Sequence, residues 1–308
     1  MTVIVLVLAA VIIGGWLLIG YVGFRTAICR GKELDFSDRA SLAGTSWDQY
    51  YDQISEGIDW IKAQEKEEHW INSQDGLRLH AELIRHPDPK GTVLMVHGYH
   101  TNPYVDFSCD AWLYYECGWN LLLIDQRAAG KSEGRYITYG VKESRDLADW
   151  CRYVNGLFGE DKRLVLAGLS MGATTVLMAC GRKLPENVTG LVADSPFSSP
   201  KDVIQSTIKR RFKISGEMLV NGIDVWSGRQ AKFNLNQMSI WQTLASNKIP
   251  LFLAHGTADT VVSPEISQYA EKTTKGPVWL LLAEGAAHGC SYLTETEKYQ
   301  EYLRKILA

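Results

Sequence analysis

The chain has 308 residues, of which 46% are hydrophobic and 22% are charged, with nine prolines. This composition excludes a disordered, collagen-like or low-complexity protein, because it supplies ample apolar side chains for a core. The net charge of −3 provides no overall basic field, so we expect no nucleic-acid partner. The charge is unevenly distributed, since no Asp, Glu, Lys or Arg precedes Arg25.

The first predicted element is an apolar helix over Val3–Phe24. At a rise of about 1.5 Å per residue it reaches about 33 Å, enough to cross a hydrocarbon core of about 30 Å. A cleaved signal peptide would have a basic start and a shorter apolar run. A buried core helix is the second alternative, but the run is long as well as apolar on all faces. We therefore expect residues 1–24 to form a retained single-pass transmembrane anchor.

Basic residues follow this helix, namely Arg25, Arg30 and Lys32, and none precedes it. The positive-inside rule then predicts that the body of the protein lies on the cytoplasmic side. The cysteines agree with this expectation, because they lack metal-type spacing and mostly stand in apolar surroundings typical of reduced, buried thiols. They are Cys29, Cys109, Cys117, Cys151, Cys180 and Cys290.

Residues 25–68 are predicted to be a connecting region with one amphipathic helix over Trp47–Lys62, where apolar residues recur at helical spacing. The pair Asp75-Gly76 between two alternating apolar runs then predicts a β-hairpin.

Beyond the hairpin, short apolar runs alternate with helical patterns, which predicts a mostly parallel sheet with helices on both faces. The expected strands are Thr92–Val96, Leu121–Asp125, Leu164–Ala167, Gly190–Ala193, Leu251–Ala254 and Val278–Ala283. The expected helices are Tyr104–Glu116, Lys142–Tyr153, Met171–Arg182, Pro264–Lys275 and Thr294–Ile306.

One connection, between Asp194 and Leu251, is far longer than a single helix needs, and we interpret residues 197–246 as a helical cap over one end of the sheet. Between Phe197 and Ala245, seven basic residues outnumber three acidic ones, a local charge of +4. A solvated helix face is one explanation of this charge. The other is that the cap faces an anionic membrane surface.

The segment Gly168-Leu169-Ser170-Met171-Gly172 matches the pattern G-x-S-x-G where an apolar strand meets a helix. The tight turn requires small flanking residues and exposes the serine above the sheet. Ser170 is therefore the predicted nucleophile, and a Gly-rich strand-to-helix turn without catalytic function is the alternative.

A nucleophilic serine needs a base, and the base needs an orienting acid. Asp259 and His288 each follow a predicted strand, in the chain order expected for this architecture. We expect His288 to take the proton of Ser170 and Asp259 to hold the imidazole. Asp194 also follows a strand and is the alternative acid.

His97-Gly98-Tyr99-His100 follows the strand Thr92–Val96. The backbone N–H groups of Tyr99 and Met171 are the predicted oxyanion hole. The His100 side chain is expected to border the substrate, or else to pack the loop. No third ligand accompanies His97 and His100 at metal-site spacing, so we expect no metal.

These residues and motifs resemble the α/β-hydrolase superfamily over most of residues 69–308, and most closely its bacterial membrane-anchored serine hydrolases. The similar segments are HGY at 97–99, DQR at 125–127 with GKSEG at 130–134, GLSMG, HGTADTVV at 255–262 and EGAAHGCSY at 284–292. Ala128-Ala129 depart from the Gly-His common among relatives. The resemblance implies an α/β-hydrolase domain over 69–308 with an uncleaved anchor, no metal or cofactor, and an acyl-enzyme mechanism.

From the sequence we expect a serine hydrolase that cleaves carboxylic esters of small or lipid acyl groups, tethered to a membrane by its N-terminal helix. Amide or peptide hydrolysis by the same triad is one alternative. A catalytically silent, membrane-tethered binding module is the other.

Overall fold

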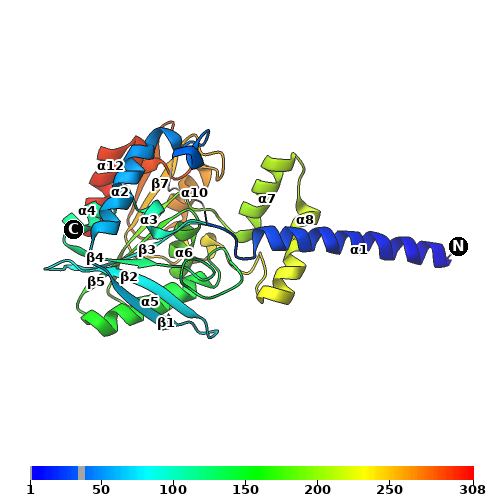
Figure 1. The fold of residues 1–308 in the computed structure, drawn as a ribbon, viewed down its shortest axis with the longest axis horizontal. Helices are drawn as coiled ribbons and strands as arrows, with labels where there is room; N and C mark the ends of the chain where they lie inside the picture. The colour runs from blue at the N-terminus through cyan, green and yellow to red at the C-terminus, as the bar shows by residue number, and fades with distance from the viewer. Residues whose placement is uncertain (1, 34–38) are drawn as a thin grey trace.

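The computed structural model describes residues 2–33 and 39–308. A long first helix, α1 (Thr2–Ala27), projects from a body in which helices surround one eight-stranded sheet (Figure 1). The sheet has the strand order β1-β2-β4-β3-β5-β6-β7-β8. Strands β1 and β2 pair antiparallel and β2 runs antiparallel to β4, while all the other pairs are parallel. The predicted mostly parallel sheet is confirmed.

Each predicted strand is present, and the predicted hairpin at Asp75-Gly76 joins β1 to β2. The strands are β1 (Glu67–Asn72), β2 (Arg78–Ile84), β3 (Gly91–Val96), β4 (Trp119–Ile124), β5 (Arg163–Leu169), β6 (Val188–Asp194), β7 (Leu251–Gly256) and β8 (Val278–Ala283). Residues of β3 alternate between two separate apolar clusters, with Leu94 on one face and Val93 on the other. The central strands are apolar throughout because both faces of the sheet are buried.

Helices cover both faces of the sheet. One face carries α5 (Glu143–Phe158), α6 (Met171–Ala179) and α10 (Glu265–Thr273). The other carries α4 (Ala111–Glu116), the short α11 (Ser291–Thr294) and α12 (Thr296–Leu307). The predicted amphipathic helix is α2 (Tyr51–Ala63), preceded by short 3-10 turns η1 (Arg39–Leu42) and η2 (Asp48–Tyr50), and it buries Ile54, Ile58 and Ile61.

The helix predicted over Tyr104–Glu116 is broken into α3 (Pro103–Asp106) and α4. At the break, the backbone of Ser108 approaches Gly57 of α2 so closely that a Cβ on Gly57 would lie 1.8 Å from the Ser108 carbonyl oxygen. Packing against α2 therefore interrupts a segment that helical periodicity alone makes continuous.

The long connection between β6 and β7 is helical, as predicted. It contains α7 (Pro200–Phe212), α8 (Glu217–Trp226), a π-helical turn η3 (Ser227–Ala231) and α9 (Ile240–Leu244). We call residues 197–246 the cap. Phe233 is buried within it, whereas Phe212 is 59% exposed at the end of α7.

Helix α8 of the cap crosses α1 (Figure 1). The crossing is close because two glycines meet there: a Cβ on Gly20 would lie 2.7 Å from the carbonyl carbon of Gly222. Two indoles reinforce it, since Trp16 Nε1 donates to the carbonyl oxygen of Met218 at 2.8 Å and Trp226 Nε1 donates to that of Leu17 at 2.9 Å. Small residues permit this kind of close helix contact.

The chain that leaves α1 is also packed against the body. Ile28 is fully buried, and the backbone of Cys29 bridges to Tyr136. The hydroxyls of Tyr99 and Tyr139 donate to the carbonyl oxygen of Ala27 at 3.0 and 2.9 Å. The end of α1 is thereby anchored to the loop that follows β3.

The Gly20–Gly222 contact predicts that a larger residue at position 20 separates α1 from the cap. We expect Gly20→Val to destabilise the folded protein by about 1–3 kcal/mol, the usual cost of overpacking a tight contact. The thermal midpoint of the detergent-solubilised protein and limited proteolysis of the cap measure the effect. Gly14→Val is the matched control, because nothing lies within 4 Å of a Cβ at that glycine. Equal midpoints for the two variants would contradict the prediction.

Candidate active site

Ser170 occupies the tight turn between β5 and α6. Its φ of 54° lies in the left-handed region, and its backbone N–H donates to the carbonyl oxygen of Asp194 at 2.8 Å. A Cβ on Gly172 would lie 1.8 Å from the carbonyl oxygen of Val96, and one on Gly168 would lie 2.3 Å from the Gly172 carbonyl carbon. The two glycines of the motif are therefore required by backbone contact, as the sequence pattern predicts.

His288 lies in the loop after β8 and faces Ser170. Its Nε2 is 2.8 Å from Ser170 Oγ, and its Nδ1 is 2.6 Å from Asp259 Oδ2. The His288 side chain is 13% exposed, so it is shielded without being sealed from solvent. The structure thus brings together the three residues that the sequence places on separate loops.

Asp259, after β7, has a fully buried side chain. Its Oδ1 accepts the backbone N–H groups of Val261 and Val262 at 2.7 and 2.9 Å, and His255 Nε2 lies 3.2 Å from its Oδ2. Burial alone would raise the pKa of Asp259, but the hydrogen bonds from His255 and His288 outweigh it and hold that pKa below its ordinary value. Asp259 is therefore a carboxylate suited to orient an imidazole and to stabilise its positive charge.

Asp194, the alternative acid, is also buried but serves different partners. Its Oδ1 accepts the hydroxyls of Ser195 and Ser291 at 2.9 and 2.8 Å, and burial raises its pKa. Asp259, and not Asp194, is hydrogen-bonded to His288.

The loop after β3 is held from two sides. Asp106 Oδ2 accepts the backbone N–H of Gly98 at 2.5 Å. Gln126 donates its backbone N–H to His97 Nε2 at 3.1 Å and its side-chain amide to the His97 carbonyl oxygen at 2.5 Å. His97 Nδ1 in turn lies 2.8 Å from the Gly98 carbonyl oxygen. Both ring nitrogens of His97 are thus occupied, and the residue shapes the loop.

Tyr99 and His100 pack at the end of α1. The two rings stack with centroids 3.9 Å apart, and the Tyr99 hydroxyl is directed to the carbonyl oxygens of Thr26 and Ala27. A Cβ on Gly31 would lie 2.5 Å from His100 Cε1, so the backbone after α1 covers the imidazole. Burial lowers the pKa of His100, which favours its neutral form. A substrate contact by His100 stays a prediction, as does the oxyanion hole of Tyr99 and Met171.

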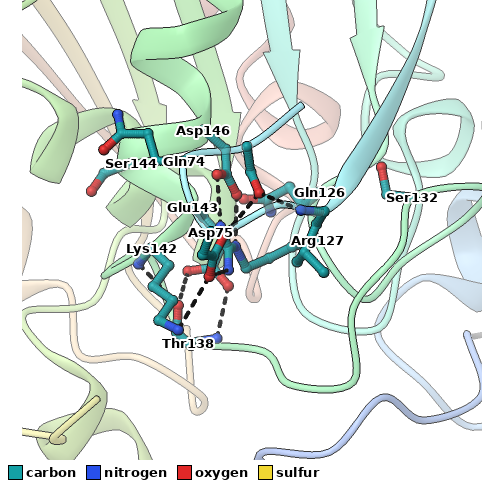
Figure 2. Close-up of polar contacts among 12 residues, drawn as sticks. Gln74, Asp75, Gln126, Arg127, Ser132, Thr138, Lys142, Glu143, Ser144 and Asp146 are labelled. Atoms are coloured by element: carbon teal, nitrogen blue, oxygen red, sulfur yellow. Dashed lines mark hydrogen bonds and ion pairs between the residues drawn. The ribbon is translucent and has the colours of Figure 1, made fainter. Parts of the chain in front are cut away.

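A partly buried ion-pair network lies next to Gln126 (Figure 2). Arg127 forms a bidentate pair with Asp146 of α5, at 2.6 and 2.7 Å, and a second with Asp75 of the hairpin turn, at 3.0 Å for both bonds. The hydrogen bonds from Arg127 lower the pKa of Asp75. Nearby, the Glu143 carboxylate accepts from the backbone and hydroxyl of Thr138. The network joins the hairpin, the loop after β4 and the start of α5 behind the candidate site.

Within the described residues, one group of three side chains is close enough to share a metal ion, namely Glu68, His80 and Glu82. It lies on β1 and β2, whereas Ser170 follows β5. The ammonium of Lys131 pairs with Glu68 and lies 3.7 Å from Glu82. The carboxylates therefore already have a cationic partner.

The arrangement can perform nucleophilic catalysis. A hydroxyl, an imidazole and a carboxylate form one hydrogen-bonded chain, so the imidazole can accept the hydroxyl proton while the carboxylate stabilises the resulting charge. The helix α6 begins immediately after Ser170, and its N-terminal dipole favours negative charge there.

Sequence reasoning did not identify three supporting residues, His255, Asp106 and Gln126. His255 and Gln126 stand inside two segments already noted in the sequence, HGTAD and DQR. His255 is four residues from its partner Asp259, whereas Gln126 is 29 residues from its partner His97. No sequence pattern marks Asp106. Its contact with Gly98 arises only because the loop after β3 folds back on α3.

Comparisons with known proteins agree with this architecture. The family model Hydrolase_4, described as serine aminopeptidase, S33, matches residues 87–232. The uncharacterized protein YqkD of Bacillus subtilis is 22% identical over 247 residues, covering 80% of this chain and 81% of its own. The uncharacterized protein YfhR of Escherichia coli K12 is 27% identical over 226 residues, covering 71% of this chain and 72% of its own.

Solved esterases have the same fold. The Pyrococcus furiosus esterase Pf2001 aligns with a TM-score of 0.64 at 25% identity, covering 80% of this chain and 92% of the esterase. The esterase EaEST of Exiguobacterium antarcticum aligns with a TM-score of 0.58 at 20% identity, covering 77% of this chain and 98% of the esterase.

Proposed function

Because the chain belongs to the α/β-hydrolase superfamily, we propose that it is a serine hydrolase that cleaves carboxylic esters through an acyl-enzyme. The observation that carries this proposal is the hydrogen-bonded chain from Ser170 through His288 to Asp259. Similarity to solved esterases supports the hydrolase class, and the ester preference is our inference from it.

In the proposed mechanism, Ser170 Oγ attacks the carbonyl carbon of the ester while His288 takes its proton. The N–H groups of Tyr99 and Met171 stabilise the oxyanion of the tetrahedral intermediate. His288 then gives the proton to the leaving alcohol, and an acyl group remains on Ser170. A water molecule, deprotonated by His288, releases the acid and restores the serine. Asp259 stays ionised throughout and keeps the imidazole oriented.

Peptide or amide hydrolysis is the second candidate, because the matched family model is described as a serine aminopeptidase. The same triad can hydrolyse esters and amides, so only the measured substrate preference distinguishes the two functions. Rates on p-nitrophenyl esters of graded acyl length, compared with the p-nitroanilides of the same acyl groups, distinguish them. Faster turnover of the anilides would overturn the ester preference.

For the N-terminal helix we propose a membrane anchor with the body on the cytoplasmic side. Helix α1 is apolar and long enough to cross a membrane, a property shared by signal sequences. Support for an anchor comes from its packed contact with α8, which cleavage would remove. Protease added outside intact cells should leave residues 25–308 uncut, while permeabilised cells should lose them. Digestion in intact cells would reverse the orientation.

The nucleophile is tested by Ser170→Ala. We expect this variant to lose labelling by a fluorophosphonate probe and to lose activity by several orders of magnitude. Its thermal midpoint should stay nearly unchanged, because the half-buried hydroxyl has one side-chain partner, His288. Ser206→Ala, at an exposed position of α7, is the control and should label like wild type. Wild-type protein that fails to label would instead support a silent binding module.

The triad acid is tested by comparing Asp259→Asn with Asp194→Asn. Loss of the carboxylate that orients the imidazole should lower kcat by about 10³–10⁴-fold in Asp259→Asn. Asp194→Asn should act mainly on the thermal midpoint, because Asp194 bonds two buried hydroxyls. A larger kcat loss in Asp194→Asn than in Asp259→Asn would reverse the assignment.

A further inference from the structure

The apolar run of α1 includes the residues that touch the cap. Counting back from Arg25, its first charged residue, the twenty residues 5–24 fill a hydrocarbon core of about 30 Å. Residues 2–15 are exposed along their whole length, whereas Trp16 and Gly20 contact α8. A membrane that surrounds this run therefore also surrounds the crossing with α8.

The depth of the cap follows from the same crossing. Trp16 is hydrogen-bonded to the backbone of Met218 and stands nine residues before Arg25. Nine residues of helix correspond to about 13 Å along its axis, which is less than half of a 30 Å core. The start of α8 therefore lies within the leaflet next to the body, not beyond it.

The surface of the cap at this level exposes three large apolar side chains. Phe212, Ile214 and Met218, at the corner between α7 and α8, are 59%, 54% and 73% exposed. We call residues 212–218 the cap corner. A cluster of large exposed apolar side chains beside an apolar helix marks a lipid-contacting surface. The indole N–H groups of Trp16 and Trp226 are both satisfied by backbone carbonyls, as hydrocarbon requires.

The charged residues in and beside the cap corner are mostly basic, which suits contact with anionic head groups. Between Lys209 and Met218 four residues are basic, and Glu217 is the single acidic one. Arg211 and Lys213 are exposed beside Phe212, and their long stems allow the charged ends to reach the head-group layer. Each basic residue near an anionic surface adds about 1 kcal/mol of attraction. This favours the membrane-facing explanation of the cap's positive charge over a solvated face.

We propose that the cap corner and the start of α8 insert into the leaflet next to the body, where they contact anionic lipid alongside α1. The anchor and the cap then form one membrane-embedded unit, and the partner is a lipid bilayer. This inference rests on the proposal that α1 crosses the membrane, and the experiment below separates the two.

The test uses the full chain in phosphatidylcholine vesicles containing phosphatidylglycerol. The photoreactive residue p-benzoylphenylalanine replaces Phe212, Ile214 or Met218 in separate variants. Val11 of α1, 66% exposed, is the reference position for the anchor. Leu157, 40% exposed at the end of α5, is the control on the body (Figure 1). After irradiation, mass spectrometry identifies lipid adducts at each site, and a wild-type thermal midpoint verifies that each variant is folded.

We expect lipid adducts at Phe212, Ile214, Met218 and Val11, and none at Leu157. Adducts at Val11 without adducts at the three cap positions would overturn the insertion of the cap while leaving the anchor intact. Absence of adducts at Val11 and at the cap would overturn both proposals. Cap adducts should also be more abundant in vesicles with phosphatidylglycerol than without it, and equal yields would overturn the preference for anionic lipid.

Discussion

The candidate site depends on one backbone contact, in which Gly172 of α6 meets the carbonyl oxygen of Val96 at the end of β3. No other residue type fits at this distance, because a Cβ would overlap the oxygen. The contact holds α6 close to the end of β3, and the turn just before it has the left-handed conformation seen at Ser170. It also brings the start of α6 next to the loop after β3, so the nucleophile and both predicted oxyanion donors depend on it.

Around this turn, the loops that carry Asp259 and His97 are held by hydrogen bonds from neighbouring polar groups. Asp259 is clamped by His255 and two backbone N–H groups, and the loop at His97 is clamped by Gln126 and Asp106. Residues whose rotamers are locked in this way position a reacting group more accurately than flexible loops do. The ion pairs of Arg127 add a further layer behind Gln126, linking the site to the hairpin of β1 and β2.

The N-terminal helix is part of this architecture and not an independent tether. Tyr99, whose backbone is a predicted oxyanion donor, binds through its side chain to the last turn of α1. The same helix packs against α8 of the cap. A displacement of α1 would therefore reach both the cap and the loop after β3, which gives this helix a direct mechanical connection to the candidate site.

The sequence by itself determined the strands, the nucleophile turn and the apolar helix, because each depends on residues adjacent in the chain: alternation or continuity of apolar side chains, and glycines beside Ser170. It also placed Ser170, Asp259 and His288 after predicted strands in the expected chain order. It did not decide between Asp259 and Asp194 as the acid of the triad. Only the tertiary structure decided that Asp259 is the carboxylate bonded to His288, that α2 breaks the helix at Ser108, and that α1 crosses α8. These outcomes depend on distances between segments far apart in the chain, which local patterns do not encode.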